Sequence, residues 1–507
     1  MAIEGGVAVL RKLALVTISF ACLSGIAMAQ DAKSVIAAAK KALGDPTSVT
    51  YSGSARDVSF QQCGANATQM TCQGMHDPMR PIGSYVRVID LSGPVSRATG
   101  TTNNIGAGGS TVVAPGTYFQ QTTAMQADVS QWGQPAVDFY ITPWGFLKGA
   151  DANNATAKKS KGFTVLTWSP SAKAPSGKSY TLNAYVNAKN QIERVETWLG
   201  ENIMGDMHIL ATYSGWKDFG GGAMAPTKIV QTRGGYPFFE VDVTSAKINP
   251  SDVATLAQAP PPPAGRGGAG GGAPAGGGAG RGGAPPALTV TTEKLGDGLY
   301  RLTTGPGSYD SLLVEFKDYV MMLEAGQSIA RGQLYIDESK KLFPNKPIRY
   351  VFNTHPHSDH TGGLPALVAN GTTIITQKNN AAFLEKSLSN PRTLLDDVLA
   401  KNPKKAKVEA VDEKKVYTDG SRTVEFYHVY PAPHSNGLLI AYIPKEKVLF
   451  QGDFTVTPGQ PANDHVKALA PVVKKLNLPF ERYINVHTSA MPQTSKDFWA
   501  VVGTGTN

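Results

Sequence analysis

The feature that most constrains the fold of this chain is a stretch rich in Pro, Gly and Ala, AQAPPPPAGRGGAGGGAPAGGGAGRGGAPP, over residues 257–286. It holds almost no apolar side chain that could offset the conformational entropy lost on ordering, so it predicts a flexible tether. The 507 residues are also too many for one ordinary domain. We therefore predict an N-terminal domain over residues 30–255, a linker over 256–288 and a C-terminal domain over 289–507.

The first residues have the pattern of a secretory signal peptide. Arg11 and Lys12 precede the apolar run LALVTISFACLSGIA, and AMA at residues 27–29 offers small side chains for cleavage. The apolar run is too short for a stable membrane span. We predict that residues 1–29 are removed and that the mature protein is periplasmic or secreted; a lipoprotein anchor at Cys22 is the alternative.

Two cysteines remain after that cleavage, Cys63 and Cys72, in the segment CGANATQMTC. An exported chain meets an oxidising compartment, where such a pair can close a small loop, so we predict a disulfide. A reactive or metal-binding pair is the alternative, but the nearest histidine, His76, makes a poor site with them.

The net charge of +9 is spread thinly along the chain. No arginine-rich helix or lysine block with interleaved aromatic residues marks a nucleic-acid surface. We expect a mildly basic protein without a nucleic-acid partner.

The N-terminal domain is expected to be rich in β-structure after a short helix, AKSVIAAAKKAL. Its β-branched and aromatic runs are separated by Gly, Asn, Ser and Pro turns; they are SYVRVIDL, PAVDFYIT, GFTVLTWS, YTLNAYVNA, IERVETWLG, MHILATYSGW and PTKIVQTRG. Such a meander must curl or close to bury its apolar face. The alternation YSGWKDFGGGAMAPTKIVQTRGGYPFFEVDVTSAKINP resembles the half-open barrels of periplasmic lipoprotein carriers, and this resemblance implies a lipid or cell-envelope component as a partner.

Strands and helices alternate beyond the linker. GLYRLTT, SLLVEF, YVMMLEA, IRYVFN, TTIITQ, VEFYHVYP, LLIAYIP, KVLFQGD and RYINVH have the pattern of strands. Helices are expected in ARGQLYIDESKKLF and over residues 381–388, 466–476 and 495–501. The overall class is therefore α+β, with helices covering sheets in the C-terminal domain.

The segment NTHPHSDHTGG follows the strand IRYVFN and concentrates four metal-ligand side chains. His355 and His357 are two positions apart and can point the same way from an extended backbone, whereas Asp359 and His360 follow where the chain turns. That geometry suits two adjacent metal ions better than one. Because a zinc ion needs three or four N or O donors, further ligands must come from elsewhere.

Three candidates lie at the ends of later strands: His434 in YPAPHSNG, Asp453 in VLFQGDF and His487 in YINVHTS. Singly, each histidine has about even odds of a structural role, and a Gly-Asp pair after an apolar strand is often only a turn. Together with the opening motif they make an ordered series of five histidines and two aspartates.

This ordered series, HPHSDH, then His434, then GDF, then His487, resembles that of the metallo-β-lactamase superfamily over residues 289–507. The resemblance implies an αββα sandwich. It also implies two zinc ions, the first held by His355, His357 and His434, the second by Asp359, His360 and His487, with Asp453 bridging them.

The chemistry expected of such a centre is hydrolysis. Two close zinc ions lower the pKa of a water between them and polarise the bond under attack. Asp453 would hold the ions at working distance, and Asp359 would orient the hydroxide and pass its proton to the leaving group. We predict hydrolysis, by metal-bound hydroxide, of an ester-, lactone-, thioester- or amide-type bond in a small-molecule substrate.

Several residues of this chain differ from those of known family members, and these differences restrict the range of substrates that we expect. Lactamases of the cysteine-containing subclass place Cys where this chain has Asp453 and Lys where it has Val456, so their carboxylate clamp is missing here. The series is more similar to glyoxalase II and lactonases, although the chain ends too soon after His487 for the helical C-terminal domain of glyoxalase II. Thr488 also replaces the glycine that commonly follows the last histidine.

Two alternatives remain open. A mononuclear iron dioxygenase of the persulfide type would use a two-histidine, one-carboxylate subset of these positions. A lipid- or lipoprotein-binding protein with an accessory metal domain would instead carry co-purifying lipid. Of the other side chains, Tyr309, Phe454 and His465 are candidate pocket walls, and His428 is expected to pack within a strand.

Overall fold

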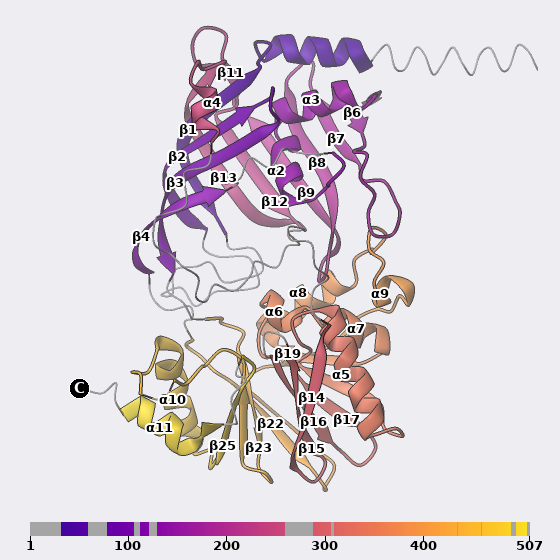
Figure 1. Ribbon diagram of the computed structural model, residues 1–507, viewed down its shortest axis with the longest axis vertical. Coiled ribbons are helices and arrows are strands. Elements are labelled where there is room, and N and C mark those ends of the chain that lie inside the picture. Colours follow the sequence, from indigo (N-terminus) through magenta and orange to yellow (C-terminus); the bar gives the residue numbers. More distant parts are fainter. Residues whose placement is uncertain are drawn as a thin grey trace, which may run out of the picture.

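The computed structural model describes residues 32–58, 79–105, 112–120, 129–258, 287–305, 309–432, 434–457, 459–487 and 493–503. Two regions follow one another in the chain and in space (Figure 1). The predicted signal peptide, Cys63 and Cys72, most of the linker and Thr488 lie outside the described residues. Those predictions, and the domain boundaries, stay predictions.

The N-terminal region is built on one open, eleven-stranded antiparallel sheet with the strand order β4-β3-β2-β1-β13-β12-β9-β8-β7-β6-β5. The strands are β1 (Ser48–Asp57), β2 (Arg80–Asp90), β3 (Val95–Ile105), β4 (Val112–Gln120), β5 (Thr156–Ser160), β6 (Phe163–Trp168), β7 (Leu182–Val186), β8 (Ile192–Glu201), β9 (Gly205–Ser214), β12 (Lys228–Arg233) and β13 (Tyr236–Ile248). A separate ribbon pairs β10 (Lys217–Asp218) with β11 (Met224–Ala225). Burial alternates along β6, β9 and β12, which shows that one face of the sheet is covered.

Helices cover that face. They are the helix over residues 32–42, α2 (Gln134–Tyr140) and α3 (Pro143–Ala152), and the short α4 (Val253–Leu256) follows β13 (Figure 1). Trp144 and Phe146 of α3 and Phe139 of α2 pack in one apolar cluster with the inward side chains of the sheet. The Thr142 side chain accepts a hydrogen bond from Gly145 N–H and so marks where α3 begins.

One predicted strand of this region is wrong. PAVDFYIT forms most of α2 instead, with Pro135 in its first turn, where a missing N–H costs nothing. Ala136, Val137 and Phe139 are all buried. A short apolar run that is buried on every side has no visible period, so helix and strand cannot be distinguished from it. The other six quoted runs are strands.

The C-terminal region has two sheets facing one another. The first has the order β14-β15-β16-β17-β18-β19-β20 and the second β21-β22-β23-β24-β25-β26. Their bounds are β14 (Thr289–Gly296), β15 (Leu299–Gly305), β16 (Tyr309–Glu315), β17 (Val320–Leu323), β18 (Ile348–Phe352), β19 (Thr373–Gln377), β20 (Lys407–Val411), β21 (Lys414–Thr418), β22 (Thr423–His428), β23 (Leu439–Ile443), β24 (Val448–Gln451), β25 (Arg482–Asn485) and β26 (Gln493–Thr494).

Helices form the two outer layers. They are α5 (Ile329–Leu342), α6 (Ser358–Thr361), α7 (Leu364–Asn370), α8 (Lys378–Leu388), α9 (Val398–Lys401), α10 (Asp464–Leu476) and α11 (Ser495–Gly503). An apolar cluster that includes Phe352, Phe426 and Phe450 fills the space between the sheets. Leu469 of α10 and Phe498 of α11 pack on the outer face of the second sheet, and α5, α7 and α8 cover the first (Figure 1). The α+β class and the αββα arrangement are confirmed.

A hairpin joins the two regions. Both carboxylate oxygens of Asp206, at the start of β9, accept backbone N–H groups, from Thr393 at 2.8 Å and Leu394 at 2.9 Å. Asp206 N–H donates to the Pro391 carbonyl at 2.7 Å, and Arg392 donates to the Asn202 carbonyl at 2.8 Å. The N-terminal region is thus fixed to the segment between α8 and α9.

Within the described residues, no helix has both the length and the apolar character required to cross a bilayer.

Candidate metal centre

The seven side chains of the ordered series meet at the ends of strands from both sheets. The group His355, His357, His434 and Asp453 has ligand atoms within 4.8 Å of one another, and so does the group Asp359, His360 and His487. Short helix α6, which carries two of these residues, lies at the edge of the C-terminal region that faces the N-terminal region (Figure 1). The structure therefore brings together every metal ligand predicted from the sequence.

The loop after β18 is folded by close backbone contacts. β18 pairs in parallel with β17 and β19, and its chain direction carries His355 and His357 to the carboxyl edge of the sheet. A Cβ on Gly363 would lie 1.9 Å from the Ala325 carbonyl oxygen, and one on Gly362 would lie 2.0 Å from that of Gln327. Only glycine permits this approach, which explains the Gly-Gly pair that ends the motif.

The remaining ligands are held by similarly specific contacts. A Cβ on Gly452 would lie 2.8 Å from Thr354 Oγ1 and 3.2 Å from His355 Nδ1, so the glycine before Asp453 makes room for the histidine loop. The loop that carries His434 is anchored from α8, where Asn380 Nδ2 donates to the Gly437 carbonyl at 2.6 Å. A close approach at Gly452 and a side-chain hydrogen bond from α8 thus help to position these two ligands.

Asp453 is shared between the two groups. Its Oδ2 lies 2.7 Å from His434 Nε2 and 3.4 Å from His355 Nε2. Its Oδ1 lies 2.8 Å from both His360 Nε2 and His487 Nε2. One carboxylate therefore presents one oxygen to each group, which is the geometry of a bridging ligand.

The imidazole nitrogens converge in pairs. His355 Nε2 and His434 Nε2 are 3.0 Å apart, and His360 Nε2 and His487 Nε2 are 3.1 Å apart. Such a distance fits either an N–H that donates to a lone pair or two lone pairs directed at one cation, and the Asp453 oxygens beside both pairs favour the cation. Imidazole and carboxylate donors at this spacing fit zinc or a comparable divalent ion.

Buried carboxylates around His360 favour positive charge at this place. Burial alone would lower the pKa of His360, but Asp453, Asp359 and Glu324 outweigh it and raise that pKa well above its ordinary value. Burial would raise the pKa of Asp453, yet the surrounding imidazoles hold it well below its usual range. The centre thus stabilises both an ionised bridge and a cation beside it.

Glu324 supports the centre and was not singled out from the sequence. Its side chain is fully buried; Oε1 accepts Thr354 N–H at 2.6 Å, and Oε2 lies 3.2 Å from His360 Nδ1. A carboxylate can only accept there, so His360 Nδ1 carries the proton and Nε2 is free to bind a metal. An acidic residue straight after the apolar strand β17 is the signal that could have identified it.

Three further side chains border the ligands. Tyr309 O–H donates to Asp359 Oδ2 at 3.0 Å, and its ring lies 4.8 Å from that of His487. His465 is fully buried, with Nδ1 3.3 Å from the Asp453 carbonyl and its ring 4.7 Å from that of His434. Phe454 is also fully buried, within the cluster under α10, so it is a core residue rather than an open pocket wall.

His428 has a packing role, as its position in a strand predicts. Its Nε2 lies 2.8 Å from the Asn436 carbonyl, and its ring stacks on Tyr430 at 5.6 Å.

Residues 304–492 match the family model described as the metallo-beta-lactamase superfamily. The C-terminal region thus carries a metallo-beta-lactamase superfamily segment. This confirms the resemblance seen in the ligand series, whereas the resemblance of the N-terminal region to lipoprotein carriers stays a prediction. The superfamily segment and its His/Asp cluster together are those of a metal-dependent hydrolase or a related enzyme.

One similar curated protein is the 2,4-dinitroanisole O-demethylase subunit alpha of Nocardioides sp. (strain JS1661). It is 24% identical over 173 residues, which are 33% of this chain and 47% of that protein. This chain therefore spans about half the length of that relative.

Solved metallo-beta-lactamases are also similar to part of this chain. The enzyme from Pontibacter korlensis is 16% identical, with 42% of this chain and 97% of that one covered and a TM-score of 0.33. FIM-1 from Pseudomonas aeruginosa, in its mono-zinc form, is 17% identical, with 43% and 95% covered and a TM-score of 0.33. The enzyme from Hirschia baltica is 19% identical, with 42% and 95% covered and a TM-score of 0.31.

Proposed function

We propose that this protein is an exported hydrolase with two zinc ions that cleaves an ester-, lactone-, thioester- or amide-type bond. The observation that carries the proposal is the position of the Asp453 carboxylate between the two ligand groups. Its Oδ2 lies 2.7 Å from the imidazole of His434, and its Oδ1 lies 2.8 Å from that of His360. A carboxylate placed in this way is suited to hold two ions side by side. A single-ion enzyme would need only one of the groups.

Each ligand group would bind one of the two ions. His355, His357 and His434 would hold one ion, and Asp359, His360 and His487 the other. When bound, two zinc ions supply a water of lowered pKa and a Lewis acid. The chain itself supplies the fixed positions, because the ligands lie on short loops tied to buried strands.

Asp359 is the residue that we expect to hold and move a proton. Burial alone would raise its pKa, but His360 and His487 lower it, so the side chain is ionised. Tyr309 O–H donates to Oδ2, which helps to orient the carboxylate for the proton that it would take from the attacking water. Proton transfer from Asp359 to the leaving group completes hydrolysis.

The first experiment is to measure metal content per chain by plasma mass spectrometry, on protein exported natively and purified without chelator. Two zinc ions in the parent and fewer in Asp453→Ala support the proposal. Asp464→Ala is the matched control, because Asp464 lies on nearby α10 outside both groups. One tightly held iron that zinc does not displace would contradict it and support the mononuclear dioxygenase.

The substrate panel should test the bond classes separately. Lactam, lactone, thioester, phosphodiester and carboxylic ester substrates cover the hydrolytic classes. An aryl methyl ether belongs in the panel because the similar Nocardioides protein is named for O-demethylation of 2,4-dinitroanisole. Turnover that is lost in Asp453→Ala assigns the bond class, while turnover that survives in this variant comes from elsewhere.

Export and the role of the N-terminal region have their own tests. Intact-mass analysis of the mature protein should give a chain that begins at Gln30, with Cys63 and Cys72 resistant to thiol labelling until reduced. The N-terminal region would serve recognition or localisation. Co-purifying lipid, extracted and identified by mass spectrometry, would support instead the lipid-binding alternative.

A further inference from the structure

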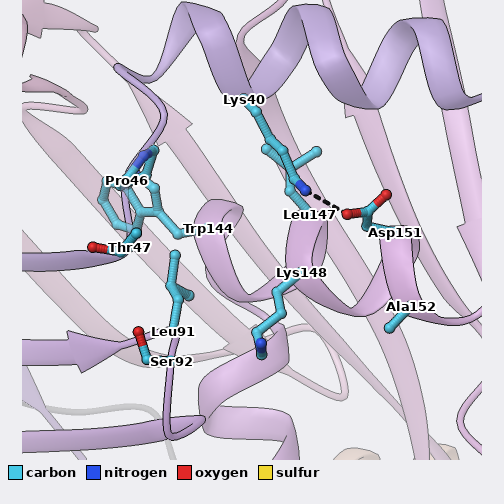
Figure 2. A pocket seen from close by; sticks show the side chains of 10 residues that line it. All are labelled: Lys40, Pro46, Thr47, Leu91, Ser92, Trp144, Leu147, Lys148, Asp151 and Ala152. Carbon is cyan, nitrogen blue, oxygen red and sulfur yellow. Dashed lines mark hydrogen bonds and ion pairs between the residues drawn. The ribbon is translucent and has the colours of Figure 1, made fainter.

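A second cavity lies in the N-terminal region, away from the metal centre. It has a volume of about 450 Å³ and is bordered by the helix over residues 32–42, the loop before β1, the turn after β2, and α3. Figure 2 shows the ten side chains that line it. Figure 1 places α3 and the helix over residues 32–42 at the end of the N-terminal region that is farther from the C-terminal region.

One side of the cavity is apolar. Trp144 and Leu147 of α3 are each only 2% exposed, and Leu91 and Pro46 also line the cavity. Residues three and four positions apart share one face of a helix, so Trp144, Leu147 and Asp151 line the same side of α3. This wall is suited to the flat or branched body of an organic molecule.

The rim of the cavity carries an unbalanced positive charge. Lys40 Nζ lies 2.6 Å from Asp151 Oδ2, an ion pair that Figure 2 shows reaching from the first helix to α3. The lining also contains Lys148, for which no ion pair or hydrogen bond with another described residue is recorded. The lining therefore contains two ammonium groups and one carboxylate.

Asp90 is not among the residues that line the cavity. Its Oδ1 accepts Ser92 N–H at 2.8 Å and Gly93 N–H at 3.4 Å, in the turn after β2. The hydroxyl of Ser92 makes no recorded hydrogen bond within the described residues and also lines the cavity. Lys148 and Ser92 thus offer two donors beside the apolar wall.

We propose that this cavity binds a small amphipathic carboxylate, independently of the reaction at the metal centre. Its apolar body packs against Trp144 and Leu147, and its carboxylate accepts from Lys148 and Ser92. One unpaired ammonium matches a monoanion better than a phosphate monoester, which carries more charge. A purely inorganic anion would leave the apolar wall unused.

The test is isothermal titration calorimetry of the full chain with 2-naphthoate, with its neutral amide as the isosteric control. Lys148→Met should weaken 2-naphthoate binding about fivefold, the upper end of the effect of one lost ion pair near the surface. Lys148→Arg should keep most of the parent's affinity for 2-naphthoate. Lys189→Met, on an exposed turn of the same region, should change nothing.

A parallel titration with laurate shows whether the cavity prefers a carboxylate with an acyl chain or one with an aromatic body. Tighter binding of laurate than of 2-naphthoate assigns an acyl-chain ligand, and the reverse assigns an aromatic acid. The proposal is overturned if the amide binds as tightly as the acid, if no binding heat is detected, or if Lys148→Met binds like the parent. The last result would place the ligand elsewhere, and loss of binding in Asp453→Ala would locate it at the metal centre.

Discussion

Buried charged side chains serve different purposes in the two regions. In the N-terminal region, Asp138 lies between two buried arginines: Arg233 Nη2 is 3.6 Å from its Oδ1, and Arg87 Nη2 donates to its backbone carbonyl at 2.9 Å. In the C-terminal region, Asp453 lies between imidazoles whose nitrogens converge on common points. The first cluster is joined by an ion pair and a hydrogen bond between its own members, whereas the second is arranged to receive a cation. Burial of charge therefore indicates function only when the lone pairs are directed at a shared position.

The largest expected effect is on metal binding. Asp453→Ala removes an oxygen from each ligand group at once, so we expect a loss in zinc affinity of at least about a thousandfold, beyond the ~10–100-fold typical of supporting residues. Competition with a chromophoric chelator measures this affinity. If Asp453→Ala retains two tightly bound ions, the bridging role is wrong.

Removing the corresponding carboxylate of the N-terminal region should affect stability instead. Asp138→Ala removes the buried carboxylate that lies 3.6 Å from Arg233 Nη2, which should cost about 3–5 kcal/mol of unfolding free energy. Urea denaturation measures this loss, with exposed Asp252→Ala as the control. Zinc content per folded chain should equal that of the parent; a large loss of zinc would show that the two regions are not independent in this respect.

A smaller effect is expected at Glu324. Gln has one acceptor oxygen in place of two, so Glu324→Gln can satisfy either Thr354 N–H or His360 Nδ1–H but not both. We expect zinc affinity to fall by ~10–100-fold. Chelator competition is again the measurement, and Glu385→Gln, which is exposed on α8, is the control. An unchanged affinity would mean that His360 is oriented by other contacts.

The smallest effect is a pH dependence of stability in the N-terminal region. Burial alone would raise the pKa of Glu196, but hydrogen bonds from His208, Tyr185 and Asn183 lower it from 4.5 to about 2. A carboxylate whose pKa is lower in the folded than in the unfolded chain stabilises the fold at pH values above its unfolded pKa of 4.5. This stabilisation is lost as the pH falls from 4.5 towards 2. Thermal unfolding of the parent should show this loss, and Glu196→Gln should show less of it.

Much of the set of metal ligands could be predicted because the ligands follow short apolar runs that can be recognised in the sequence. Each of His355, His434, Asp453 and His487 follows an apolar run that is a strand, and a strand end is a fixed place in a layered fold. Glu324 was missed for the opposite reason. Its contacts to Thr354 and His360 span 30 and 36 positions, so no short motif contains them.

The sequence by itself determined nine strands and four helices of the C-terminal region, the order of its metal ligands, and the Pro/Gly/Ala stretch between the two regions, whereas β14, β20 and β21 were not predicted. These features depend on hydrophobic period, turn chemistry and residue type, which are local properties. Only the tertiary structure decided that most of PAVDFYIT is a helix, that Asp453 presents one oxygen to each ligand group, and that, among the described residues, Lys40 pairs with Asp151 whereas Lys148 makes no such ion pair. Each of these depends on which distant side chains share a buried space, and a linear pattern does not specify that.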